Sequence, residues 1–269
     1  MGAFAKYKKT FLLSFQNGME YRVDFMLSIV SGVFIMIVQC ALWTAVFKSS
    51  PQSVINGYTY KEMITYSIFS GVVSKLVAAG FEGEIANDIK SGGLSKFLTQ
   101  PQNYFLYRFF NFIGGKILQI FIVIIISAVV MVVFSTGWGI TVTLGSVCCF
   151  CISILLGLMI NFLIFYTASS LAFVMTEVWG AFMALSQGSY LLSGGIFPLD
   201  IFGERVYRAV QYLPFKYTVF FPVNIINGHL NGTDIWNGFL VQIIWILILL
   251  LLSKVCWSRG LKKYVAVGG

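Results

Sequence analysis

The strongest constraint on the fold is a long stretch of the chain that carries no charge. Residues 117–176 contain no Asp, Glu, Lys, Arg or His. A bilayer core about 30 Å thick is crossed by a helix of about 20 mostly apolar residues, so this stretch is long enough for two crossings. Continuous runs such as IFIVIIISAVVMVVF also lack the alternation of a membrane β-barrel strand. The stretch therefore predicts paired membrane-spanning helices.

The remaining apolar segments extend this prediction to the whole chain. Of its 269 residues, 58% are hydrophobic, and the mean hydropathy of +0.85 lies far above that of a soluble domain. We predict one all-α integral membrane domain over residues 1–269 with six transmembrane helices. The predicted spans are residues 24–47, 62–80, 103–134, 142–173, 178–199 and 234–256.

A helix that lies in the membrane surface is predicted before the first span, over residues 4–22. At 100° per residue its apolar side chains fall on one arc, and most of its lysines lie off that arc. The arc consists of Phe4, Tyr7, Phe11, Leu12, Phe15 and Met19. Aromatic residues opposite lysines are typical of an interfacial amphipathic helix.

A second unusual segment, residues 200–232, precedes the last span. Pro198 ends or kinks the fifth span, and Pro214 and Pro222 interrupt the apolar residues that follow. These pieces are too short to cross a bilayer, so they predict an external re-entrant or amphipathic hairpin. A loop folded over the spans without a function remains the alternative.

The distribution of basic residues predicts how the chain is oriented across the membrane. They cluster before the first span, between the second and third, and after the last, which all lie on one side if the chain crosses six times. The positive-inside rule then puts both termini in the cytoplasm. The net charge of +8 is explained by this topology, so no nucleic-acid partner is expected. We expect a multi-pass protein of a bacterial plasma membrane, with Lys75 reaching from the second span to the cytoplasmic interface.

The cytoplasmic segment 81–101 is polar and charged, but apolar positions recur in it at helical spacing. Two short amphipathic pieces are predicted around Gly92–Gly93, and they suit either docking on a soluble partner or an ordinary solvated loop. The residues predicted to dock are Glu84, Ile85, Asp88, Ile89, Lys90, Leu94 and Phe97.

No catalytic or metal-binding motif is present in the sequence. There is no GxxxxGK[ST] phosphate loop, no HExxH metal motif and no Ser/His/Asp set. We therefore expect no catalytic residue, metal or cofactor in this chain and an energy source outside it. Polar residues inside the spans either line a substrate path or hydrogen-bond neighbouring helices. The candidates for a path are Gln39, Asn161, Ser169, Ser170 and Gln187.

Several of these features together resemble the permeases of ABC-2 type transporters. They are the amphipathic N-terminus, the six spans, the charged second cytoplasmic segment and the break at 194–198, Gly-Gly-Ile-Phe-Pro, before an external hairpin. The sequence from Glu84 through Leu94 to Pro101 is similar to the I-x-x-x-I-x-x-G-x-L…P pattern of the branch related to daunorubicin-type exporters.

The resemblance implies partners and a function. Segment 81–101 would be the coupling helix that contacts a cytoplasmic nucleotide-binding ATPase subunit, which holds ATP and Mg. A second permease chain, identical or different, and membrane lipid would be the other partners. The chain would then serve an ATP-driven translocase that exports an amphiphilic small molecule, peptide or lipid-like substrate. The alternatives are a non-transporting assembly or immunity protein and, less favoured because most spans lack ionisable groups, a secondary transporter.

Overall fold

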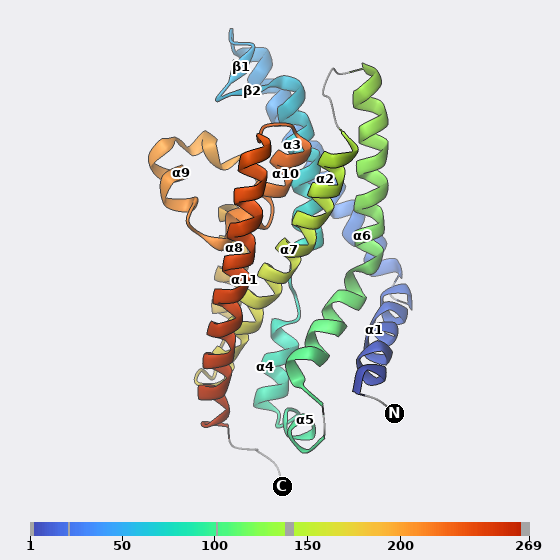
Figure 1. Ribbon diagram of the computed structural model, residues 1–269, viewed down its shortest axis with the longest axis vertical. Coiled ribbons are helices and arrows are strands. Elements are labelled where there is room, and N and C mark those ends of the chain that lie inside the picture. Colours follow the sequence, from blue (N-terminus) through green and yellow to red (C-terminus); the bar gives the residue numbers. More distant parts are fainter. Residues whose placement is uncertain (1–2, 21, 101, 138–142, 265–269) are drawn as a thin grey trace.

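The protein is a bundle of helices that run roughly along one long axis (Figure 1). The computed structural model describes residues 3–20, 22–100, 102–137 and 143–264, so Pro101, Trp138 and Gly139 lie outside the described residues. The long helices are α1 (Ala3–Glu20), α2 (Arg22–Ser49), α3 (Tyr60–Val77), α6 (Tyr104–Gly137), α7 (Leu144–Ser169), α8 (Trp179–Leu192) and α11 (Gly232–Leu261). Shorter elements are β1 (Val54–Ile55), β2 (Tyr58–Thr59), α4 (Glu82–Lys90), α5 (Ser95–Thr99), η1 (Ser170–Phe173), η2 (Leu199–Phe202), α9 (Glu204–Val210), η3 (Pro214–Tyr217) and α10 (Phe220–Ile226).

Five described helical segments are long and apolar enough to cross a membrane. They are Val30–Ser49, Tyr60–Lys90, Tyr104–Ile125, Leu144–Phe173 and Gly232–Leu261. The prediction of a helical multi-pass membrane protein is thereby confirmed, but the number of six spans is not. The helix expected over 178–199 is α8, which has 14 residues and ends at Leu192. At 1.5 Å per residue it is about 21 Å long, less than the bilayer core.

The chain leaves the helical path after α8 because Gly194 has a positive φ of 81°. The backbone carbonyls at this break are satisfied from three other elements. Tyr66 of α3 donates its hydroxyl to the Gly194 oxygen (2.7 Å), and the Phe220 amide of α10 donates to the Ser193 oxygen (2.8 Å). Gln39 of α2 donates to the Ile196 oxygen (3.3 Å). Irregular backbone is stable at membrane depth only when protein groups pair with it in this way.

The segment that follows the break returns into the bundle. All seven residues of α10 are buried, and the helix packs on α3 and α7. In contrast, α9 projects from the side of the molecule (Figure 1). The expected hairpin between the fifth and last spans is thus an exposed helix followed by a buried one.

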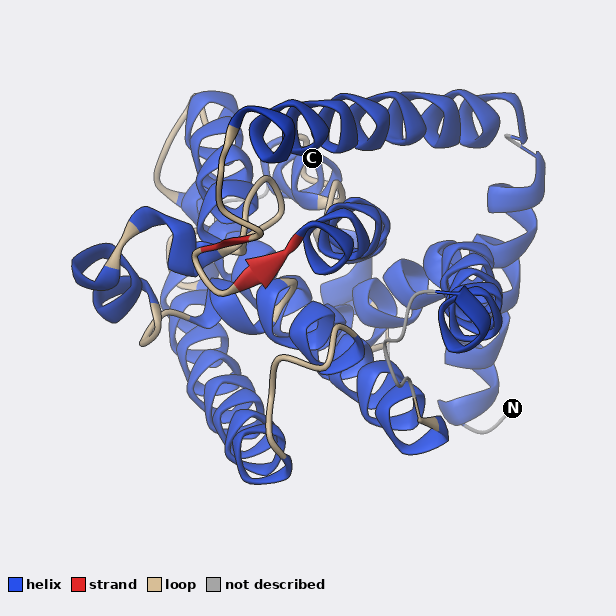
Figure 2. Ribbon diagram, turned by 90° about the horizontal axis from the view of Figure 1, so that it is seen from above, coloured by secondary structure: helices blue, strands red, loops and turns tan. Residues whose placement is uncertain are grey.

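A two-stranded hairpin closes the end of the molecule opposite α4 and α5 (Figures 1 and 2). Its turn is Asn56-Gly57, with φ angles of 49° and 85°, as a type I′ turn requires. The hairpin carries Tyr58, which is buried and donates its hydroxyl to the carboxylate of Asp200 (2.9 Å). The hairpin is therefore fixed to the segment after α8.

Aromatic side chains fill the core where α4, α6, α7 and α11 meet. The ring of Phe162 in α7 lies at its centre, with ring centroids 5.1–5.6 Å from those of Phe81, Phe105, Phe109, Phe112 and Tyr166. Tyr166 stacks in turn on Trp257 of α11, 4.7 Å away. Further along α11, the buried Gln242 bonds to Ser153 of α7 and to the Tyr217 carbonyl.

The first helix, α1, packs along α6. Ser14 donates to the Asn111 carbonyl (2.7 Å), and Tyr7 stacks on Phe110. The approach is close because Gly114 has no side chain: a Cβ there would lie 2.6 Å from the Phe11 carbonyl oxygen. Leu12 and Met19 stay exposed, so only part of the predicted apolar arc faces the protein.

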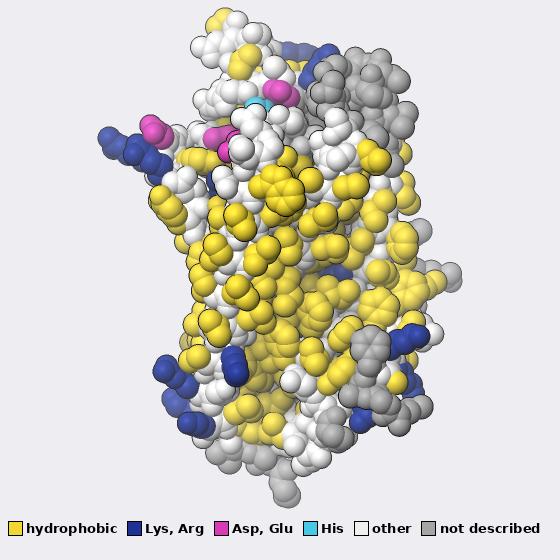
Figure 3. Space-filling view, viewed as in Figure 1, with side chains coloured by type: hydrophobic (Ala, Val, Ile, Leu, Met, Phe, Trp, Pro, Cys, Tyr) yellow, Lys and Arg dark blue, Asp and Glu magenta, His cyan; other side chains and the backbone are white. Residues whose placement is uncertain are grey.

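Hydrophobic side chains cover the middle of the molecular surface (Figure 3). On the face shown, charged side chains lie towards the two ends: lysine and arginine towards both, and the visible carboxylates towards the end that carries the β1–β2 hairpin (Figures 1 and 3). An apolar belt between charged ends is the surface expected of a protein embedded in a bilayer.

Candidate functional site: a cavity among the spans and a docking helix

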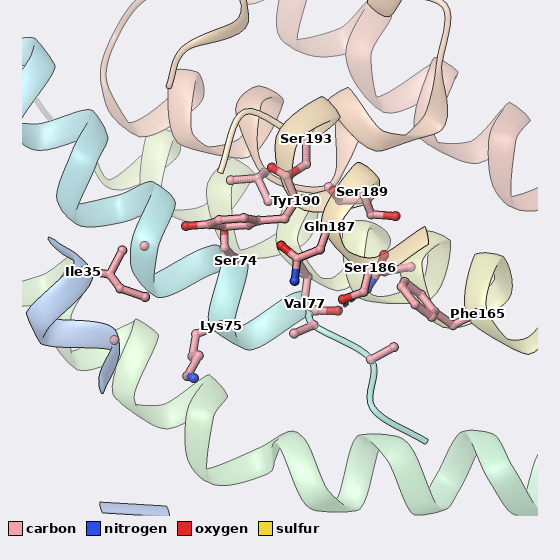
Figure 4. Close-up of a pocket in the computed structure, with 17 residues that line it drawn as sticks. Ile35, Ser74, Lys75, Val77, Phe165, Ser186, Gln187, Ser189, Tyr190 and Ser193 are labelled. Carbon is pink, nitrogen blue, oxygen red and sulfur yellow. Dashed lines mark hydrogen bonds between the residues drawn. The ribbon is translucent and has the colours of Figure 1, made fainter. Parts of the chain in front are cut away.

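A cavity of about 350 Å³ lies between α2, α3, α7 and α8 (Figure 4). Ile35 of α2, Val77 of α3, Phe165 of α7 and Val219, just before α10, give it apolar walls. Ligand pockets in proteins usually combine such walls with a few polar groups that orient the ligand.

The polar groups come mainly from α8 and from the last turns of α3. Ser186, Ser189, Tyr190 and Ser193 recur at intervals of three and four residues, so they form one stripe of α8 that faces the cavity. Across from them, Ser74 lies beside Tyr190 (Figure 4).

Two hydroxyl groups of this lining have no hydrogen-bond partner among the described residues. The Oγ atoms of Ser74 and Ser189 are both buried and unpaired, and Ser189 is 9% exposed overall. A buried hydroxyl without a partner costs about 1–3 kcal/mol. Both oxygen atoms are almost fully covered, so a molecule or water in the cavity can bond to them only after the side chains rotate.

The five residues predicted to line a path are not gathered in one place. Asn161 and Gln187 line the cavity, and Asn161 also donates to the Val77 carbonyl at the end of α3. Gln39 lies outside the lining and bonds to the carbonyls of the broken segment. Ser169 and Ser170 donate to carbonyls of their own turns, at Phe165 and Thr167.

Sequence reasoning missed Ser74, Ser186, Ser189 and Tyr190 as lining residues. The helical spacing of the α8 stripe was a usable signal, since an otherwise apolar membrane helix rarely carries four polar groups on one face without a reason. No comparable signal identified Ser74, because its contribution depends on how α3 is rotated against α8.

The second candidate site is α4, which lies at the end of the molecule near the chain termini (Figure 1). The residues predicted to dock divide by face. Ile85, Ile89, Leu94 and Phe97 are buried in the core of this chain, so their side chains hold the segment in place. Glu84 and Lys90 lie on the exposed face, together with Asn87, which the sequence prediction left out.

One buried arginine ties α4 to α6. The Arg108 guanidinium, 5% exposed, donates to Glu84 Oε2 (2.6 Å) and Asp88 Oδ2 (2.5 Å). Its Nε also donates to the Tyr104 hydroxyl, which donates to Asp88 (2.7 Å). Removing the carboxylates would leave the buried charge of Arg108 uncompensated, which is costly, although Glu84 itself is 63% exposed.

A second link runs from α4 to the turn between α7 and α8. The Lys90 ammonium group donates to the Thr176 carbonyl, and Ile85 and Ile89 pack in the core shared with α7. The helix α4 is therefore joined to α6 by charge and to α7 by packing.

Comparison with known proteins identifies the family. Neither the curated proteins nor the solved structures contain a match to this chain. Residues 33–268 match the family model described as ABC-2 family transporter protein, which covers the cavity, α4 and every predicted span except the start of the first. The chain belongs to the ABC-2 family of transporter proteins and is a membrane permease component of an ABC transporter.

Proposed function

We propose that the chain forms half of the pathway of an ATP-driven exporter. In this proposal, α4 transmits the conformational change of a cytoplasmic ATPase to the membrane helices. The observation that carries this proposal is the Arg108 cluster. It joins a helix whose outer face is polar to a membrane helix through a buried arginine, whose partners Glu84 and Asp88 are 63% and 20% exposed.

The exposed face of α4 suits a soluble partner. Glu84, Asn87 and Lys90 recur at helical spacing and present both charge signs. Mixed charge at the rim of an interface favours one orientation of the partner. ATP and Mg belong to that partner, since this sequence has no phosphate loop.

The cavity between α3, α7 and α8 is the proposed substrate path. The helix α4 contacts one wall of the cavity, α7, directly and another, α3, through α6, so a displacement of α4 would change its width. A second permease chain, identical or different, completes the path. The cargo is an amphiphilic small molecule, peptide or lipid-like compound, which suits a cavity with apolar walls and a polar stripe.

The proposed membrane arrangement follows the charge distribution. Both termini and α4 lie in the cytoplasm of a bacterial cell, and the β1–β2 hairpin lies outside. In this arrangement α8 and the broken segment after it together make the fifth of six crossings, and α11 makes the last. Export, and kinship with daunorubicin-type permeases, rest on the sequence similarity around residues 84–101.

The test is ATPase stimulation in the reconstituted complex. Reversing charge on the exposed face with Lys90→Glu should weaken assembly with the ATPase and reduce stimulated hydrolysis. Arg208→Glu, on the exposed helix α9, is the matched control and should change neither. Normal assembly and transport by Lys90→Glu together with an equivalent Asn87→Lys variant would contradict docking at α4.

A further inference from the structure

Two lysines converge beside the cavity. Lys75 lines it near the end of α3, and the ammonium group of Lys116 in α6 lies 3.5 Å from the Lys75 carbonyl oxygen. On its other side, the Lys75 chain reaches α2, with its Cε 4.0 Å from where a Cβ of Gly32 would lie. Both lysines belong to segments that are apolar enough to span the membrane, and Lys75 is exposed near the end of its span.

Among the described residues, no ion pair joins a carboxylate to Lys75 or Lys116. The hydrogen bonds that Lys116 makes within the described part of the chain go to neutral acceptors, the Lys75 carbonyl and the Gln119 side chain. No acidic residue is present among the residues that line the cavity, where Lys75 carries the only charge.

Charged residues in membrane-spanning segments are costly and usually pair or face a polar path. Lys116 contacts the backbone of Lys75 and not its ammonium group, so an anion that enters the cavity would meet the charge of Lys75 first. The cavity adds two unpaired hydroxyls, on Ser74 and Ser189, and apolar walls at Ile35 and Phe165. These features complement a molecule with an anionic head and an apolar body.

We propose that the cavity binds an anionic amphiphile, with its carboxylate, phosphate or sulfate head at Lys75 and its apolar part along α2 and α7. Lys116 supports the site as a second positive charge, and Ser74 and Ser189 donate to the head. This inference rests on the cavity being the substrate path and narrows the substrate class to anions.

The test is direct binding to the full-length chain in nanodiscs of phosphatidylcholine. The probe is dansyl-undecanoic acid, and its methyl ester is the neutral control with the same apolar part. The acid should bind about tenfold more tightly than the ester, as expected for one favourable charge interaction of about 1.4 kcal/mol. Lys75→Gln should remove this preference and Lys75→Arg should keep it.

Matched controls separate the site from general surface charge. Lys48→Gln, at the opposite end of the first span, should leave the preference unchanged, and Lys116→Gln should reduce it. Thermal unfolding of each variant checks that it is folded. Equal binding of acid and ester by the wild type, or an unchanged preference in folded Lys75→Gln, would overturn the proposal.

A second arm identifies the source of the anion. Phosphatidylglycerol added to the nanodiscs displaces the probe if the site takes a membrane lipid and leaves it bound if the site takes a free amphiphile. Both results agree with an anionic head at Lys75. Displacement identifies a membrane lipid as the ligand, and no displacement identifies a free amphiphile. The binding assay needs no ATPase, so the anion site can be confirmed even if the docking proposal fails. Conversely, a probe that shows no preference for the acid would overturn the anion site and leave the docking proposal standing.

Discussion

Asp88 of α4 lies 2.5 Å from the guanidinium of Arg108 in α6, and this contact crosses from the docking helix to a membrane helix. The arginine side chain is 6% exposed, and the aspartate side chain is 20% exposed. Arg108 also holds Glu84 from the same side. A single side chain thereby fixes the orientation of α4.

The first prediction concerns this arginine. Arg108→Gln should lower the free energy of unfolding by about 1.5–3 kcal/mol, because hydrogen bonds to charged groups are lost. It should also uncouple ATP hydrolysis from transport, because α4 is no longer held to α6. Arg208→Gln, whose partner Glu204 is 79% exposed, should cost about 0.5 kcal/mol or less. Thermal unfolding and transport per ATP hydrolysed are the measurements, and tight coupling in Arg108→Gln would refute the role given to the cluster.

The second prediction concerns the contact of α1 with α6. Gly114→Ala should displace α1, since the added Cβ would meet the Phe11 backbone at 2.6 Å. Gly115→Ala is the control, because its nearest neighbour is the Ser14 hydroxyl at 3.9 Å. Gly114→Ala should lower the free energy of unfolding by about 1–3 kcal/mol, as at other overpacked sites. Equal unfolding temperatures for the two variants would show that α1 does not pack as described.

The third prediction concerns the amide that joins α7 to α11. Gln242→Leu should destabilise the protein by about 0.6–1.7 kcal/mol, the range for interhelical hydrogen bonds in membranes. The buried Ser153 and the Tyr217 carbonyl lose their partner. Gln187→Leu, the same change at an exposed residue of the cavity, should leave stability nearly unchanged. Comparable destabilisation by both would mean that the Gln242 bonds contribute little.

The fourth prediction concerns pH. Burial raises the pKa of the Asp200 carboxyl, an effect that the Tyr58 hydrogen bond and the nearby His229 oppose. The folded pKa then lies above the unfolded value of about 3.9, so the folded state binds more protons between the two. Stability should therefore fall as pH rises from about 4 through the raised folded pKa.

Asp200→Asn removes this dependence and can still accept the Tyr58 hydrogen bond. The difference in unfolding temperature, wild type minus variant, should decrease over that range and then level off. Because His229 faces the same cluster, both proteins are also compared in a His229→Gln background. A difference that stays flat, or that grows with pH, would show that the folded pKa of Asp200 is not raised.

The sequence predicted the helical membrane class because uncharged runs are a direct signature of crossing a bilayer. It did not predict that α8 ends at Leu192. Apolar composition continues through Ile196 and Phe197, and the carbonyls at the break are satisfied by Tyr66 and Gln39, which are distant in sequence.

The candidate sites were predicted only in part, because they too depend on contacts between residues that are distant in sequence. Helical spacing identified the amphipathic character of 81–101, but it could not say which face is buried. Ile85 and Ile89 face the core, and Glu84 and Asp88 bond to Arg108, which lies outside the segment and so could not be read from its spacing. In the cavity, Asn161 and Gln187 were found by composition alone, whereas Ser74 depends on the packing of α3 against α8.

The most direct test of the central claim is photo-crosslinking from the exposed face of α4. A photoreactive residue at position 87 in the native membrane should attach to a polypeptide that carries a GxxxxGK[ST] phosphate loop, identified by peptide sequencing. The same residue at position 54, in the exposed hairpin at the opposite end, should give no such product. A phosphate-loop protein that co-purifies with the chain but crosslinks only from position 54, or from neither position, would contradict docking at α4.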